Sequence, residues 1–486
     1  MATNNTKQTA WLALGSLLSF GFSIVSSMIL SRYLSKGDYG TYRQVMYVYN
    51  TLLTVFLLGL PRTFSYFLPR VPIDQAKHLI NKLNGLFLAT GAVFSLFLFL
   101  AARPIALSLD NPDLEEALRL FSPVPLLMLP TQGLDGILAT YRKNAFMAIY
   151  TLLTRVLMLL CVALPVMMCG YGYKEAIVGF DIASLLMFFL ALALKYYPVR
   201  TAGHEKCNIT YKEIFQFAIP LLLGSLWALV INSADSFFVS RWYGKVTFAE
   251  FSNGAMELPF VGMIVAATTT VLSPIFSRMS HENVDLRKEM YPLWKNVFYK
   301  SGMLIYPMLI YCIFFADTLM VALYGQAYEV SAIYFRIKNI SFFFSIIAFA
   351  PLLINTGQVK LYSNLHMWNA LAVVVLEYAS VLLIPSAVGV CVVSTICRIG
   401  LVLAALMAVA KYFDVRLKEL FPKELLSILA VSAVILILIR VLLPFVSANV
   451  WIVLFASAGL YTVLYLIAAK WLKIDYLSIV RPLLQK

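Results

Sequence analysis

Two arginines lie near the middle of long apolar stretches of the sequence. Arg155 stands in "YTLLTRVLMLLCVALP" and Arg398 in "CVVSTICRIGLVLAAL". A guanidinium group is always ionised and presents its N–H donors as a planar fork, so it suits the oxygens of a diphosphate. The alternative for each residue is a structural role, in which the guanidinium bonds backbone carbonyls or a carboxylate of its own helix bundle.

Three further basic residues are candidates for the same chemistry. Arg62 follows Pro61 in "LLGLPRTFSYF", and Arg336 and Lys338 stand in "YFRIKNISFFF". Proline removes a backbone hydrogen bond and bends a helix, so we expect a kinked helix in which Arg62 either guards a cavity mouth or anchors the chain in the cytoplasm. Arg336 and Lys338 either line a cavity or extend their long side chains to a membrane interface.

Three acidic residues also fall in apolar surroundings. Asp235 and Glu377 lie within such stretches, and Asp181 lies near the end of another. An ionised side chain costs at least ~2.5–3.5 kcal/mol inside a membrane, so it should face protein or a wet cavity. A carboxylate there that takes up H⁺ or Na⁺ would respond to an ion gradient. The alternative is an internal ion pair, for example between Glu377 and Arg398.

No metal site, catalytic group or further cofactor is expected. The six cysteines show no C-x-x-C spacing, and the four histidines are scattered along the chain. Most of the cysteines lie inside apolar stretches, where they serve as small packing residues. Ion coupling by H⁺ or Na⁺ is therefore the one cofactor-like role that the residues suggest.

The composition predicts that these residues are held by membrane-spanning helices. Of 486 residues, 61% are hydrophobic and 13% are charged, with a mean hydropathy of +0.83. A soluble protein has roughly 45–50% apolar and about 25% charged residues. This chain has too little polar surface to cover soluble cores of its size, and lipid is the solvent that suits it.

About fourteen stretches are long and apolar enough to cross a bilayer, which takes about 20 helical residues. Short alternating segments typical of a membrane barrel are not found, so an all-α polytopic fold is predicted. The expected spans are 9–30, 44–61, 83–101, 117–138, 146–169, 176–194, 213–239, 254–275, 297–315, 333–354, 363–384, 387–410, 425–444 and 450–469.

The distribution of basic residues predicts the orientation. With a cytoplasmic N-terminus, the two tails and the even-numbered loops carry 25 of the 38 Lys and Arg residues, against seven in the odd-numbered loops. Cytoplasmic loops carry the excess of positive charge, so both termini are expected inside. This bias and anionic lipid account for the net charge of +14. No basic stripe on a soluble domain is present, so nucleic acid is not an expected partner.

The chain contains a weak internal repeat. A shift of 209 residues aligns 15–44 with 224–253, with seven identities in thirty positions. The aligned polar residues include Ser31/Ser240, Arg32/Arg241 and Lys36/Lys245, and the aligned aromatic residues are Tyr33/Trp242, Tyr39/Phe248 and Tyr42/Phe251. Chance similarity between two apolar helices is the alternative to duplication.

The repeat predicts the domain organisation. Six crossings separate the matched helices, so the halves would be parallel, which is a plan that transporters use with substrate at the repeat interface. We expect two parallel six-helix bundles around a central cavity plus two C-terminal helices. The boundaries are 1–195 for the first lobe, 196–212 for a cytoplasmic linker, 213–411 for the second lobe, and 412–486 for the additional helices and tail.

Three stretches resemble a known family. They are "LGSLLSFGFSIVSSMILSRYLSKGDYGTYRQ" (14–44), "GLPRTFSYFLPR" (59–70) and "FAIPLLLGSLWALVINSADSFFVSRWYG" (217–244). The first is similar to the R-x-L-x-x-x-x-Y-G-x-Y helix exit of polysaccharide-biosynthesis transporters, here Arg32, Leu34, Tyr39, Gly40 and Tyr42. These are O-antigen and related lipid-linked oligosaccharide flippases of the multidrug/oligosaccharidyl-lipid/polysaccharide (MOP) superfamily. In the third stretch, Asp235 stands in the family's usual aspartate position.

The resemblance implies a function and partners. It implies alternating access that carries an undecaprenyl-diphosphate-linked oligosaccharide across a bacterial plasma membrane, for surface polysaccharide assembly. Membrane lipids and, in the same pathway, a glycan polymerase and glycosyltransferases are the implied partners. A flippase for a peptidoglycan lipid precursor is a close alternative.

Two other classes of protein are weighed against this one. A drug/cation antiporter of the same superfamily predicts an acidic cation site and usually twelve spans, whereas the buried charge here is mostly basic. A membrane enzyme that polymerises or ligates glycans needs catalytic groups, usually on a long outside loop, and no such loop is predicted. No nucleotide-binding loop is present either, so ATP hydrolysis is not expected.

Overall fold

The computed structural model describes residues 2–203, 205–282, 284–345, 349–442, 449–472, 474 and 476, with side chains from residue 18 onward. All regular elements in this part of the chain are helices, which confirms the predicted all-α membrane fold. The chain forms two compact units, Met1–Ala249 and Glu250–Lys486. The lobe and linker boundaries predicted from the sequence stay a prediction.

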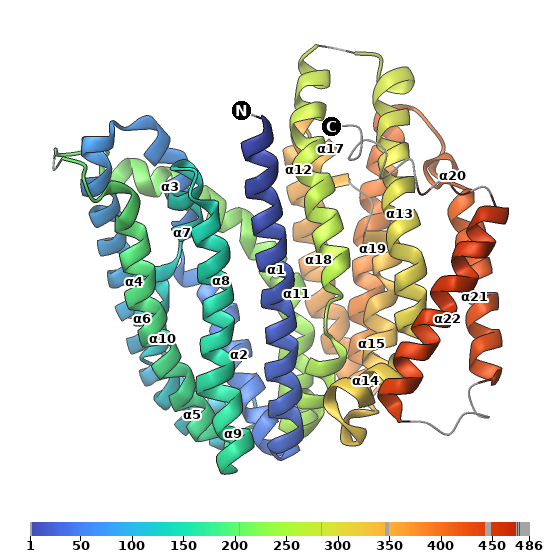
Figure 1. Cartoon of the computed structure of the whole chain (residues 1–486), viewed down its shortest axis with the longest axis horizontal. Helices are drawn as coiled ribbons and strands as arrows, with labels where there is room; N and C mark the ends of the chain where they lie inside the picture. The colour runs from blue at the N-terminus through green and yellow to red at the C-terminus, as the bar shows by residue number, and fades with distance from the viewer. Residues whose placement is uncertain are drawn as a thin grey trace. The chain divides into compact units, whose positions relative to one another are not determined.

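The first unit is a bundle in which α1 packs along α8, while α10 packs on α5, α6 and α8 (Figure 1). Stacked rings such as Phe56 on Phe94, with centroids 4.4 Å apart, fill its core. Its helices are α1 (Ala2–Tyr33), α2 (Lys36–Phe56), α3 (Pro61–Phe67), α4 (Ile73–Ser108), α5 (Asp113–Phe121), α6 (Val124–Met128), α7 (Leu134–Thr140), α8 (Asn144–Met158), α9 (Leu164–Cys169), α10 (Tyr173–Tyr196) and most of α11 (Tyr211–Gly254).

In the second unit α18 packs on α19, α13 on α21 and α12 on α17. A ring cluster of Trp294, Phe298 and Phe413 lies in its core. The helices are α12 (Pro259–His281), α13 (Tyr291–Phe314), α14 (Ala316–Tyr324), α15 (Ser331–Ile340), α16 (Phe342–Ser345), α17 (Phe349–Asn355), α18 (Val359–Leu383), α19 (Ala387–Phe413), α20 (Leu417–Leu420), α21 (Glu424–Leu442) and α22 (Val450–Trp471).

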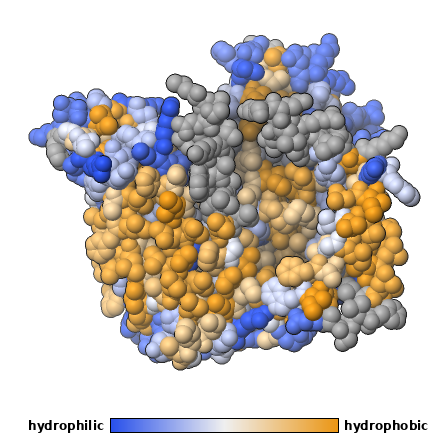
Figure 2. All heavy atoms as spheres, in the orientation of Figure 1, coloured by the Kyte–Doolittle hydropathy of each residue, from blue (hydrophilic) through white to orange (hydrophobic). Residues whose placement is uncertain are grey.

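Eleven helices of the described part are long and apolar enough to cross a membrane, or twelve if the bent pair Ser331–Phe344 and Phe349–Asn355 is one span. Figure 2 shows apolar side chains along the flanks of the helices and hydrophilic ones gathered at helix ends. The number of fourteen spans stays a prediction. The expected span at 117–138 is broken into α5, α6 and α7, of nine, five and seven residues.

The predicted kink before Arg62 is present. Helix α2 ends at Phe56, Leu58 and Gly59 have positive φ angles of 51° and 72°, and α3 begins at Pro61. Proline suits the first helical position, where its missing N–H leaves no bond unmade. The whole stretch Lys36–Arg70 counts as one span, so Arg62 lies on its second, reoriented part.

Burial supports the internal repeat. Tyr39 and Phe248 are each 1% exposed, whereas Tyr33 and Trp242 are 56% and 41% exposed. Ser31 and Ser240 are both buried as well. Chance similarity between two apolar helices would not match exposure position by position, so duplication is the better explanation.

The C-terminal ends of the two aligned segments lie in contact within the first unit, where α2 meets α11. A Cβ atom at Gly40 would lie 2.1 Å from the carbonyl oxygen of Lys245, so the backbones meet where only glycine fits. Gln44 Nε2 donates to Ser240 Oγ at 2.7 Å. Helix α2 starts on a capping bond from the Asp38 backbone N–H to Ser35 Oγ at 3.1 Å.

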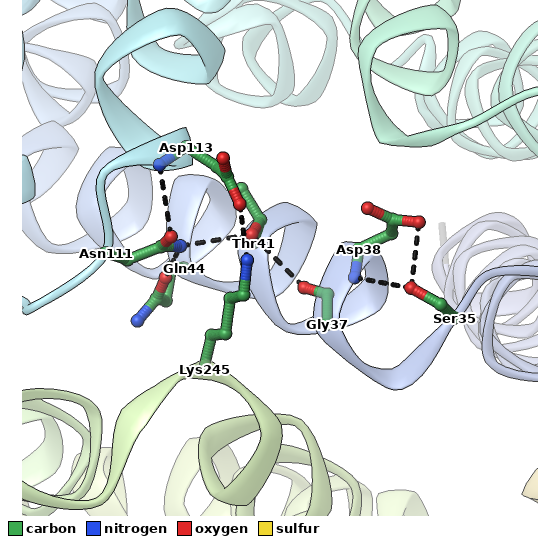
Figure 3. A network of polar contacts seen from close by, with 8 residues as sticks. All are labelled: Ser35, Gly37, Asp38, Thr41, Gln44, Asn111, Asp113 and Lys245. Carbon is green, nitrogen blue, oxygen red and sulfur yellow. Dashed lines mark hydrogen bonds and ion pairs between the residues drawn. The ribbon is translucent and has the colours of Figure 1, made fainter.

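A closed polar network supports this contact (Figure 3). The Asn111 amide donates to Gln44 Oε1 at 2.5 Å and to Thr41 Oγ1 at 3.0 Å. Lys245 forms an ion pair with Asp113. Because Thr41, Gln44 and Asn111 are at most 1% exposed, their satisfied bonds specify one arrangement of α2, α5 and α11.

Candidate substrate-binding site

Two cavities in the first unit share the side chain of Arg155. The Arg62 cavity has a volume of about 460 Å³ and is lined by residues that include Arg62, Ser65, Gln132, Asp135, Thr151 and Arg155. The Arg43 cavity has a volume of about 240 Å³ and is lined by residues that include Ser23, Ser26, Ser27, Arg43, Asn50 and Arg155. Both cavities carry charged and hydroxyl groups within a bundle of apolar helices.

Arg155 is positioned between them by α1 and α8. Its Nε donates to Ser19 Oγ on α1 at 3.1 Å. This is the one hydrogen bond of the Arg155 side chain to the residues that the structure describes, and its guanidinium lines both cavities. The side chain lies at the edge of both cavities, so a bound anion would reach it from either side.

A π-helical turn, η3 (Leu159–Ala163), follows Arg155 in the same span. Such wide turns often occur at functional sites, because they change which face of a helix each later residue occupies. The turn packs against α1 and α10, the elements that also border the Arg43 cavity. The local geometry of the span is therefore irregular directly beside the shared arginine.

Arg62 lies in the first turn of α3 and is exposed to the Arg62 cavity. Within the described part of the chain no hydrogen bond or ion pair of its guanidinium is found. The cavity also holds one carboxylate, Asp135. Two guanidinium groups against one carboxylate give the lining a net positive charge, which favours an anionic ligand.

Sequence reasoning missed Lys195, which is fully buried in the first unit. Its Nζ donates to Asn84 Oδ1 at 3.0 Å and to the carbonyl of Gln132 at 2.7 Å. It also lies 4.7 Å and 5.2 Å from the ring centres of Phe64 and Phe87. A lysine directly after an apolar stretch resembles an interfacial anchor, so its position in the sequence gave no signal of burial.

Arg43 was also missed, because it lies in a charged loop on the sequence. The structure places it in α2, half-buried on the wall of the Arg43 cavity. The spacing from Tyr39 could have indicated this position, because residues four apart lie on one face of a helix. Tyr39 and Tyr42 line the same cavity.

The predicted basic residues of the second unit have protein partners. Arg398 Nη1 lies 3.8 Å from Glu257 Oε1, and Lys338 Nζ donates to Ser394 Oγ at 2.8 Å. Arg336 Nη2 lies 3.4 Å from Asp317 Oδ1. Of the five predicted basic residues, Arg62 and Arg155 line the same cavity, in the first unit. Contact of cargo with any of these residues stays a prediction.

Asp317 connects three elements of the second unit, because Arg440 of α21 and Arg336 of α15 both pair with it on α14. Partial burial raises the pKa of the Asp317 carboxyl, but the hydrogen bond from Arg440 and the charges of both arginines outweigh burial and hold the pKa below its ordinary value. A structural role fits this carboxylate.

The three candidate coupling carboxylates differ in their surroundings. Asp235 is 4% exposed on α11 and its Oδ1 accepts from the Ser236 backbone N–H at 2.6 Å. Glu377 is fully buried on α18. Asp181 is half-buried on α10, and its Oδ1 has no hydrogen-bond partner among the described residues. Coupling to H⁺ or Na⁺ stays a prediction for all three.

No cluster of three or more histidine, cysteine or acidic side chains that could hold a metal is found among the described residues. The donors that line the two cavities are guanidinium, hydroxyl and amide groups. Such groups bind and orient a polar ligand.

Comparison with known proteins gives a family and a fold. The family model described as polysaccharide biosynthesis protein matches residues 29–333. A search of curated proteins found no match. Among solved structures, the lipid II flippase MurJ in its inward closed conformation is 14% identical with a TM-score of 0.73, over 95% of this chain and 98% of that chain.

Two further solved structures are transporters of the MATE family. An inward-facing multidrug resistance MATE transporter of the MOP superfamily is 13% identical with a TM-score of 0.63, over 82% of this chain and 95% of that chain. A mutant of the Vibrio cholerae MATE transporter VcmN is 14% identical with a TM-score of 0.60, over 85% of this chain and 97% of that chain. At such identities the likeness shows the fold. The chain thus belongs to the polysaccharide biosynthesis protein family and shares its fold with these solved structures.

Proposed function

We propose that this protein is a flippase that moves an undecaprenyl-diphosphate-linked oligosaccharide from the cytoplasmic to the outer leaflet. The observation that carries the proposal is the Arg62 cavity, where the guanidinium groups of Arg62 and Arg155 line one cavity inside an apolar helix bundle. A diphosphate is the part of such a cargo that hydrocarbon excludes most strongly, and two guanidinium forks are suited to hold it.

The walls of this cavity are preorganised for binding. The hydroxyl groups of Thr131, Thr151 and Thr154 donate to carbonyls of their own helices at 2.7–2.8 Å. These side chains therefore need little rearrangement when a headgroup enters, which lowers the ordering cost of binding. The polyprenyl tail would stay in the bilayer while the headgroup crosses through the protein by alternating access.

The positive charge of the Arg62 cavity helps to distinguish between the alternative functions. A cationic drug would meet two arginines in the Arg62 cavity, which disfavours the drug/cation antiporter. A peptidoglycan lipid precursor also carries a polyprenyl diphosphate, so these arginines suit it equally well. The choice between oligosaccharide and peptidoglycan precursor is made by experiment.

The setting of the proposal follows from the sequence. The excess of basic residues in the tails and even-numbered loops supports both termini in the cytoplasm, and the proposed cargo implies a bacterial plasma membrane. Glycosyltransferases would supply the cargo on the cytoplasmic side and a glycan polymerase would consume it outside. Asp235, Glu377 and Asp181 remain the candidates for H⁺ or Na⁺ coupling.

The test is deletion of the gene, followed by measurement of lipid-linked glycan on the cytoplasmic side. Accumulation of the oligosaccharide lipid, and not of the peptidoglycan precursor, is expected. Wild type should rescue the strain, whereas Arg62→Ala and Arg155→Ala should fail at equal expression. Arg119→Ala is the matched control, because Arg119 is half-exposed and its ion pair is with Glu115 of its own helix. Rescue by both cavity variants would overturn the proposal.

A further inference from the structure

The Arg43 cavity carries hydroxyl groups that the protein leaves open. Ser23, Ser26 and Ser27 lie on one face of α1 at helical spacing and line this cavity. No hydrogen bond of these three hydroxyls is found among the described residues. A polar group without a partner inside a membrane protein is costly, so it is expected to meet water or a ligand.

Other serines of the first unit behave differently. Ser31 on the same helix donates to the Met28 carbonyl at 3.1 Å. Ser225 and Ser233 on α11 donate to carbonyls of their own helix at 2.7 Å and 2.6 Å. Back-bonding of this kind is the usual outcome for serine in a helix. The three serines of the Arg43 cavity differ from these back-bonded serines, because their open hydroxyls line a cavity.

The opposite wall of the Arg43 cavity adds an amide, a cation and aromatic rings. Asn50 offers two donors and an acceptor, and no hydrogen bond of its side chain is found in the described part of the chain. Arg43 and the rings of Tyr39, Tyr42 and Phe180 complete the lining. Open hydroxyl and amide groups beside aromatic faces can bind a ligand that alternates hydroxyl groups with C–H surfaces.

The two cavities thus differ in the chemistry that they present. The Arg62 cavity has threonine hydroxyls closed onto their own helices and an arginine without a described partner. The Arg43 cavity has three open serine hydroxyls and an amide beside Arg43. Arg155 belongs to both. An anionic group at Arg155 would therefore meet a second guanidinium in either cavity, while the larger set of open neutral groups, three serine hydroxyls and one amide, lies in the Arg43 cavity.

We propose that the Arg43 cavity is a sugar-binding site, which holds the first monosaccharide of the cargo while Arg62 and Arg155 hold the diphosphate. The proposal rests on the proposed function, because it divides one headgroup between the two cavities. The volume of about 240 Å³ is below the roughly 300–1,000 Å³ of pockets for drug-sized ligands. One sugar ring suits this space, and the rest of the oligosaccharide lies outside it.

The experiment measures binding of two lipids to the purified full chain in nanodiscs. One lipid is undecaprenyl diphosphate without sugar, and the other is undecaprenyl diphosphate that carries one N-acetylhexosamine. The variant Ser23→Ala/Ser26→Ala/Ser27→Ala removes the open hydroxyls at nearly constant volume. A second variant, Ser26→Leu, fills the cavity. Ser31→Ala is the control, because its hydroxyl is bound to its own helix. Thermal melting curves check that each variant is folded.

The sugar-bearing lipid should bind each cavity variant about tenfold more weakly than wild type, since the hydrogen bonds lost are worth about that factor together. The sugar-free lipid should bind wild type, both variants and the control alike. Equal weakening of both lipids, or no weakening of either, would overturn the sugar site. Wild type that binds neither lipid would contradict the proposed function itself, and the sugar site with it.

Discussion

The ammonium group of Lys195 lies 2.7 Å from the carbonyl oxygen of Gln132, at a point where the backbone is not helical. Gln132 is extended and Gly133 has a φ angle of 75°, so the Gln132 carbonyl lies outside the helical hydrogen-bond pattern. Non-helical backbone inside a membrane protein must be satisfied by other protein groups. Lys195 is thus a positioning residue for the wall of the Arg62 cavity.

Replacement of Lys195 by methionine should loosen this wall. The Gln132 carbonyl and Asn84 Oδ1 would each lose a donor, at about 1–3 kcal/mol for a buried group left unmatched. Amide hydrogens of residues 129–135 should exchange roughly tenfold faster, as measured by hydrogen exchange and mass spectrometry. Lys174→Met is the control, because Lys174 pairs with Glu116 at an exposed site. Unchanged exchange in Lys195→Met would show that other groups hold the wall.

Arg155→Lys separates charge from shape at the shared arginine. Lysine keeps the positive charge but lacks the planar fork and the Nε–H bond to Ser19. Charge-assisted hydrogen bonds are worth about 1.5–3 kcal/mol each, so flipping of lipid-linked oligosaccharide in proteoliposomes should fall by roughly ten- to a hundredfold. The initial rate is the measurement. Wild-type rates in Arg155→Lys would mean that only the charge matters.

Gly40→Ala should destabilise the first unit. The new methyl group would lie 2.1 Å from the Lys245 carbonyl, so α2 and α11 must separate. Overpacking of this kind costs about 1–3 kcal/mol, which thermal unfolding in detergent will report as a lowered melting temperature. Gly37→Ala on the same helix is the control, because its nearest neighbour would be an ordinary 3.5 Å contact. Equal melting temperatures for the two variants would contradict the contact.

The Asp317 cluster predicts a pH dependence of stability. The pKa of the Asp317 carboxyl is lower in the folded protein than in the unfolded one. Its contribution to the free energy of unfolding is therefore fully present at pH values above the unfolded-state pKa. That contribution is lost as the pH falls through the folded-state pKa. Asp317→Asn should melt below wild type at pH 7, and the difference should shrink as pH falls below about 4. Thermal melts across pH are the measurement. If the difference in melting temperature were the same at every pH, the ion pairs with Arg440 and Arg336 would not be its cause.

Much of the fold was predictable because it depends on local signals. Apolar length indicated the helical membrane fold, and Pro61 indicated the kink before Arg62. The family motif included Gly40 but did not explain why glycine is needed there. The explanation is the Lys245 carbonyl, which lies next to Gly40 only in the folded chain. The helix breaks within 117–138 were missed, since apolar composition alone does not place them.

The candidate site was less predictable, because it depends on contacts between distant residues. Arg155 and Arg62 were singled out as ionised groups in or beside apolar stretches, and the structure places both on one cavity. Lys195 and Arg43 were overlooked, because both flank apolar stretches in the sequence and turn inward only through packing. For Arg398 and Arg336, the sequence did not indicate that Glu257 and Asp317 would lie beside them.

The wide turn at Leu159–Ala163 has a consequence for how this chain can vary. A π turn amounts to one extra residue in an α-helix, and each residue of an α-helix turns by about 100°. Deleting a single residue here would tighten the turn and rotate α9 relative to Arg155 by that angle. The spacing between Arg155 and Cys169 should therefore be fixed more strictly than the identity of the apolar side chains between them.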